Sequence, residues 1–145
     1  MEASRQITQK NRPTWQLFLP AAILTVSIFI LSHQERPPTI GDDPQLSAIA
    51  GHLIAYGMLG GALWLAFSSL LRHAPQAALA AILGAGLYGV VEEIHQSFVP
   101  GRHADPWDLL ADVVGATIVV LLIAGWRVST RSGLGIRRNI DRTLS

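Results

Sequence analysis

The residues of this chain that could do chemistry are acids, histidines and hydrogen-bonding side chains placed inside long apolar segments. Three pairs of them are separated by four positions, namely His52 and Tyr56, Glu92 and Gln96, and Asp108 and Asp112. Residues four positions apart lie on one face of a helix, so each pair forms a polar strip along a helix. If the helices cross a membrane, the strips avoid lipid only by facing one another. The sequence therefore predicts one polar cluster built from three helices.

The charges of this cluster limit what it can hold. Several carboxyl groups in one low-dielectric site cannot all be ionised unless positive charge compensates them. Arg102, a protonated histidine or a bound cation would supply that charge, and Arg102 would also suit a phosphate or a carboxylate. Two purely structural explanations stay open. Asp105 and Asp108 fit the cap of a helix that starts at Pro106, and Arg102 fits an anchor at the lipid headgroups.

The same residues suggest two further kinds of chemistry. For catalysis, either Glu92 or Glu93 would act as a general base, and its partner would be His52 or His95. A metal would find nitrogen and oxygen ligands in His52, Glu92, His95 and Asp112. Di-metal helix bundles use the Glu-x-x-His spacing twice, however, and it occurs once here. The sequence therefore predicts no metal and no other cofactor.

The composition indicates a membrane protein. Half of the 145 residues are hydrophobic and 14% are charged, against about a quarter in soluble domains. Apolar segments near membrane-spanning length predict four helices, over about residues 14–32, 46–71, 76–98 and 106–126. Small residues at four-residue spacing, Gly57 and Gly61, then Ala81, Ala85 and Gly89, favour close helix packing. We expect an all-α polytopic membrane protein, a four-helix bundle over residues 14–126.

The two ends of the chain lie outside this domain. Residues 1–13 form a polar N-terminal segment, and residues 127–145 form a basic tail that we expect to be mobile. Four spans put both ends on one side, together with most of the lysines and arginines, so the positive-inside rule predicts cytoplasmic termini. These arginines cluster at the chain ends and not on a patterned face, so nucleic acid is not an expected partner.

This topology sets the depth of the polar residues. His52, Glu92 and Asp112 each lie about six residues from the outer end of a helix, which is roughly 9 Å of helix. They therefore share the outer third of the membrane, in a three-helix site that opens outward. His95 shares the face of Glu92 three positions away, whereas Glu93 points about 100° away from it. Glu93 would meet a different neighbour or the headgroups.

The polar motifs resemble those of the VanZ-like family of small bacterial membrane proteins. The resemblance covers most of residues 45–125 and rests on Gly51-His52-x3-Tyr56, on Glu92-Glu93-x2-Gln96 with Pro100-Gly101-Arg102, and on Asp105-x2-Asp108-x3-Asp112. It implies a multi-pass protein of the bacterial cytoplasmic (inner) membrane, with a link to the cell envelope and to sensitivity to teicoplanin, a lipid-tailed glycopeptide. Many members have asparagine where this chain has Asp112, so the resemblance does not require an acid there.

Three functions compete. The first is a site that binds a lipid-linked or lipid-tailed envelope ligand, through His52, Tyr56, Glu92, Gln96, Arg102, Asp108 and Asp112. The second is a membrane-embedded hydrolase or transferase that acts on a lipid, although the chain contains no cysteine and no serine nucleophile motif. The third is a proton- or cation-coupled carrier, for which four helices are few unless several copies assemble. The sequence leaves homo-oligomerisation open.

Overall fold

The structure is a computed structural model that describes residues 13–34 and 42–143. Its regular elements are a short 3-10 helix, η1, and four α-helices: η1 (Thr14–Phe18), α1 (Leu19–Ser32), α2 (Pro44–Leu70), α3 (Ala74–Gln96) and α4 (Pro106–Thr143). Four spans are long and apolar enough to cross a membrane, Thr14–Ser32, Pro44–Leu70, Ala74–Gln96 and Pro106–Arg127. The protein is thus an all-α, multi-pass membrane protein with four transmembrane helices, which confirms the predicted fold class.

The surface of the bundle is apolar where lipid would contact it. Large hydrophobic side chains point outward along α3 and α4, and Leu87 and Leu122 are each 67% exposed. In a soluble protein such residues would form the core, because exposing them to water is unfavourable. A bilayer removes that cost, so the outward Leu and Ile side chains support the membrane assignment.

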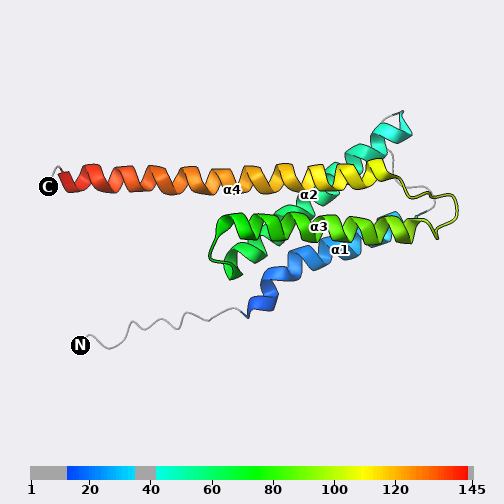
Figure 1. Cartoon of the computed structure of the whole chain (residues 1–145), viewed down its shortest axis with the longest axis horizontal. Helices are drawn as coiled ribbons and strands as arrows, with labels where there is room; N and C mark the ends of the chain where they lie inside the picture. Colours follow the sequence, from blue (N-terminus) through cyan, green and yellow to red (C-terminus); the bar gives the residue numbers. More distant parts are fainter. Residues whose placement is uncertain (1–12, 35–41, 144–145) are drawn as a thin grey trace.

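Proline and aspartate mark the starts of α2 and α4, two of the three helices that carry the polar strips. The Asp43 side chain accepts hydrogen bonds from the backbone N–H groups of Gln45 at 2.9 Å and Leu46 at 3.2 Å, directly before α2. At the start of α4, Asp105 accepts from the Trp107 backbone N–H at 2.9 Å. These caps satisfy N–H groups that have no partner inside the helix. They fix where α2 and α4 begin, at the same end of the bundle where α3 ends (Figure 1).

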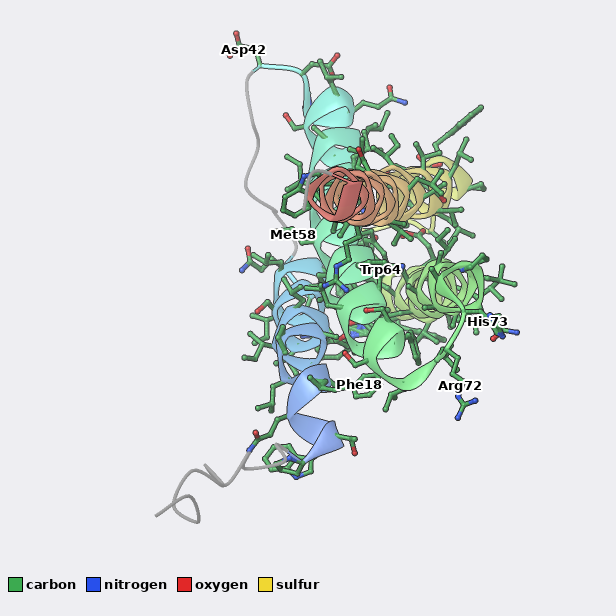
Figure 2. All side chains as sticks on the ribbon, turned by 90° about the vertical axis from the view of Figure 1, so that its left-hand side faces the viewer. Phe18, Asp42, Met58, Trp64, Arg72 and His73 are labelled. Carbon is green, nitrogen blue, oxygen red and sulfur yellow. The ribbon has the colours of Figure 1, made fainter. Side chains whose placement is uncertain are left out.

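The helices alternate in direction, and α2 lies at the centre. Figure 2 shows α1 on one side of α2, with α3 and α4 on the other. The buried core contains mainly small or planar side chains, among them Trp64, Ala66, Ala81, Ala85 and Ala116. Glycines Gly57, Gly60 and Gly61 of α2 face the α4 segment from Gly115 to Val119. Small residues let two backbones approach closely, so the side chains between them are held at fixed positions.

The last helix is longer than the sequence analysis expected. Helical geometry continues past residue 126 to Thr143, and this part of α4 projects beyond the ends of the other helices (Figure 1). The apolar part of the helix ends at Arg127, close to the expected boundary. The segment from 127 to 143 contains no proline and has five arginines, which are good helix formers, and the helix continues through it despite Gly133 and Gly135.

Candidate functional site

The best-defined contact of the site joins α2 to α4. The His52 ring nitrogen Nδ1 lies 2.8 Å from the Asp112 carboxylate oxygen Oδ1, and Asp112 is 1% exposed. Gly89 of α3 makes room for this pair, because a Cβ atom at that position would lie 2.7 Å from Asp112 Oδ2. Three helices therefore determine the position of one buried carboxylate.

Asp108 lies one turn before Asp112 on the same face of α4. Its Oδ2 is 3.5 Å from Nε2 of His52, so the imidazole ring stands between two carboxylates. Of the two acids for which helix capping was a possible explanation, Asp105 caps α4 through its side chain. Asp108 instead faces the histidine.

Glu93 also belongs to this cluster, although the sequence analysis named it only as a candidate base. Its Oε2 accepts a hydrogen bond from the backbone N–H of Asp105 at 2.7 Å, so an α3 side chain caps the start of α4. Its Oε1 is buried without a hydrogen-bond partner among the described residues. One ligand atom each from His52, Glu93 and Asp108 lie within 4.8 Å of one another.

Glu92 points to another side of α3 and contacts α2. The Tyr56 hydroxyl donates a hydrogen bond of 2.5 Å to Glu92 Oε2, and the two residues are 1% and 3% exposed. The ring of Tyr56 is stacked on that of His52, with centroids 6.2 Å apart. The Tyr56–Glu92 pair thus continues the polar strip of α2 toward the interior. Glu92 Oε1 has no partner in the described part of the chain.

A turn after α3 returns Arg102 to the end of that helix. The turn includes Gly101 at φ 79°, a left-handed conformation that glycine adopts at little cost. Arg102 Nη2 then donates to Gln96 Oε1 at 2.9 Å, and Gln96 is 1% exposed. Gln96 Nε2 is buried without a partner among the described residues.

His95 lies on a different side of α3 from this cluster. Its ring packs against Phe29 of α1, with centroids 4.4 Å apart, and lies 5.4 Å from the ring of His33. The structure thus brings together eight of the nine residues named from the sequence and places His95 next to α1. These eight are His52, Tyr56, Glu92, Glu93, Gln96, Arg102, Asp108 and Asp112.

Tyr88 is a polar contact that the sequence analysis did not name. Its hydroxyl donates to the backbone oxygen of Thr25 at 2.8 Å and so ties α3 to α1. It lies four residues before Glu92, so the same four-residue spacing that identified the other strips would have identified it.

Replacing Tyr56 with phenylalanine is expected to lower the free energy of unfolding by about 1–3 kcal/mol, because the buried Glu92 carboxylate loses its hydroxyl donor. Tyr88→Phe is the matched control, since it removes a hydroxyl bonded to a backbone carbonyl within α1 and should cost at most about 1 kcal/mol. Thermal unfolding of the purified variants in detergent measures both. Equal losses would contradict a special contribution of the Tyr56–Glu92 bond.

Comparison with known proteins gives a consistent assignment. A family model described as VanZ/LLP1 matches residues 2–127, which includes all four transmembrane spans and every residue of the cluster. Searches of curated proteins and of solved structures found no match. The resemblance noted in the polar motifs is thereby confirmed over most of the chain, and we conclude that this protein belongs to the VanZ/LLP1 family.

Proposed function

We propose that this protein binds the polar head of a lipid-linked or lipid-tailed envelope molecule at the end of the bundle where α2 and α4 begin. The observation that carries this proposal is a set of buried polar atoms there that have no hydrogen-bond partner among the described residues, Glu92 Oε1, Glu93 Oε1 and Gln96 Nε2. An unsatisfied buried polar group costs about 1–3 kcal/mol, and such atoms are typically satisfied by a ligand or by water.

The chemistry of the site favours a ligand with both donor and acceptor groups. The two carboxylates would accept hydrogen bonds from hydroxyl or amine groups, and the Gln96 amide would donate one. Arg102 uses Nη2 to contact Gln96, and its guanidinium has further N–H groups that suit a phosphate or a carboxylate. Phe98, at 81% exposed, and Trp107, at 64% exposed, flank this end with apolar surface for a hydrocarbon tail.

We assign the site to the outer face of a bacterial cytoplasmic membrane. Among the described residues, Arg72 and Arg127 lie at the end of the bundle opposite to the site, whereas Arg102 lies at the site end. Positive charge is retained on the cytoplasmic side, which supports cytoplasmic termini. A ligand with its tail in the outer leaflet would then reach the site without crossing the membrane.

The test compares a strain lacking this protein with strains complemented by wild type, Glu92→Ala or Ser97→Ala. We expect Glu92→Ala to behave like the deletion, in envelope lipid composition and in sensitivity to teicoplanin-type glycopeptides, while its amount in the membrane stays at the wild-type level. Ser97 is exposed at the same end of the bundle, and its hydroxyl donates to the Ile94 carbonyl of its own helix, so Ser97→Ala should complement fully. Full complementation by Glu92→Ala would refute the proposal.

A second candidate, a hydrolase or transferase acting on such a lipid, is favoured by the His52–Asp112 pair. A carboxylate bonded to Nδ1 orients an imidazole so that Nε2, here on the side of Asp108, keeps a lone pair that can take up a proton, which is the arrangement of a general base. Incubation of the purified protein with envelope lipids distinguishes the two functions. Turnover that His52→Gln abolishes supports the enzyme, whereas binding without turnover supports the first proposal.

A further inference from the structure

We propose that His52, Glu93 and Asp108 bind one divalent cation, of a type that accepts both imidazole and carboxylate ligands, such as Zn²⁺ or Mn²⁺. This differs from the sequence-based expectation of no metal, and from the set that the sequence offered, because Glu93 and Asp108 replace Glu92, His95 and Asp112. The cation would take Glu93 Oε1, one of the three unpartnered atoms of the proposed lipid site, and would leave Glu92 Oε1 and Gln96 Nε2 to the lipid. Binding of Zn²⁺ to the purified protein is measured without any lipid ligand, so its failure is distinguishable from failure of the proposed function.

The three candidate ligand atoms lie close enough together to share one cation. The three ligand atoms come from α2, α3 and α4 and lie within 4.8 Å of one another, and His52 Nε2 lies 3.5 Å from Asp108 Oδ2. Three atoms with this spacing all lie within about 2.8 Å of a common point, close to the metal–ligand distances of roughly 2.0–2.6 Å. A small movement of the side chains would complete the coordination.

Glu93 has a buried carboxylate oxygen without a partner among the described residues. Glu93 is 7% exposed, and only its Oε2 is satisfied, by the Asp105 backbone N–H. Its Oε1 has no hydrogen-bond partner in the described part of the chain. A buried carboxylate in this state is costly, and coordination of a cation is one of the few ways to stabilise it.

The imidazole of His52 is oriented as in metal-binding histidines. Histidines that bind metals nearly always donate the other ring N–H to a carboxylate, which fixes the tautomer and raises the basicity of the ligating nitrogen. Asp112 Oδ1 is placed to accept from Nδ1 of His52 at 2.8 Å. Nε2 is left with its lone pair on the side of Asp108.

The site gathers more acidic groups than basic ones. Glu93, Asp108 and Asp112 meet at one place, and His52 is the one ion-pair partner of these acids among the described residues. Arg102 donates to the neutral amide of Gln96. A divalent cation would balance Glu93 and Asp108, and three protein ligands would leave a position open for water or a ligand oxygen.

The test uses the full-length protein in detergent, purified through an affinity tag without histidines, stripped with EDTA and titrated with Zn²⁺ by calorimetry. We expect one Zn²⁺ per chain and a melting temperature that rises with Zn²⁺ concentration. Glu93→Gln and Asp108→Asn should each weaken binding at least tenfold, and Asp112→Asn should weaken it by about 10–100-fold, because a neutral amide does not raise the basicity of His52 as a carboxylate does.

Two control variants make the experiment decisive. Asp43→Asn changes an exposed carboxylate at the same end of the bundle and keeps the helix cap, so Zn²⁺ affinity should be unchanged. His95→Gln should also retain the wild-type affinity, because His95 packs against Phe29. Absence of Zn²⁺ binding by the wild type, wild-type affinity in both Glu93→Gln and Asp108→Asn, or loss of binding in His95→Gln would overturn the proposal. If Glu93→Gln does not fold, Asp108→Asn decides, since its side chain is 13% exposed.

Discussion

Replacing Asp112 with alanine is expected to lower the free energy of unfolding by about 3–5 kcal/mol, the cost of breaking a buried charged pair by removing one partner. Asp112 is 1% exposed and accepts a hydrogen bond from Nδ1 of His52. In the variant, the Nδ1–H group of His52 would lose this acceptor. The variant also leaves a void next to Gly89, where the carboxylate now packs. Thermal or denaturant unfolding in detergent measures the loss.

A double variant shows whether this cost comes from the pairing. Leucine has the same branching as aspartate, so His52→Phe together with Asp112→Leu removes both polar partners and keeps the volume filled. We expect it to recover most of the stability that Asp112→Ala loses, because buried ion pairs often contribute little compared with apolar replacements. The stability of Asp112→Asn should lie between that of Asp112→Ala and that of the double variant, because its amide oxygen still accepts a hydrogen bond from Nδ1 of His52. A double variant as unstable as Asp112→Ala would contradict this account.

The recovered stability should not restore function. A double variant that folds yet fails to complement a deletion strain would show that the His52–Asp112 pair is retained for binding or chemistry and not for the fold. Complementation by the double variant would instead remove this pair from both proposed functions.

Replacing Gly115 with valine is expected to destabilise the protein by about 3 kcal/mol or more, at the upper end of what overpacking usually costs. A Cβ atom at this position would collide with the backbone of Leu53, with its Cα at 2.9 Å and its carbonyl oxygen closer still. A backbone cannot rotate away as a side chain can, so α2 and α4 would have to separate. Separation would also pull His52 away from Asp112.

The matched control for Gly115 lies on the same helix. A Cβ atom at Gly125 would meet nothing within 4 Å, so Gly125→Val introduces the same side chain without a clash. We expect its melting temperature to stay within a few degrees of the wild type, whereas Gly115→Val should be strongly destabilised or fail to accumulate in the membrane. Similar behaviour of the two variants would show that the α2–α4 contact is looser than the structure indicates.

Much of the fold was predictable because the signals for it are local. A transmembrane helix requires about 20 apolar residues in a row, and this is visible without knowledge of any other segment. The predicted second and third helices, residues 46–71 and 76–98, correspond to Pro44–Leu70 and Ala74–Gln96. The end of α4 was missed, because hydropathy reports where a helix leaves the apolar region and not where helical geometry stops.

The sequence alone determined which residues share a helix face, and so predicted the polar strips of α2, α3 and α4, because the 3.6-residue period of a helix fixes the angle between neighbouring side chains. The sequence could not determine which neighbouring helix each of these side chains contacts. On α3, Glu92 contacts Tyr56 of α2, Glu93 on one side reaches the start of α4, and His95 on the other reaches α1. That assignment depends on how the helices are arranged around one another, which close packing of their glycines and alanines fixes only in the folded bundle.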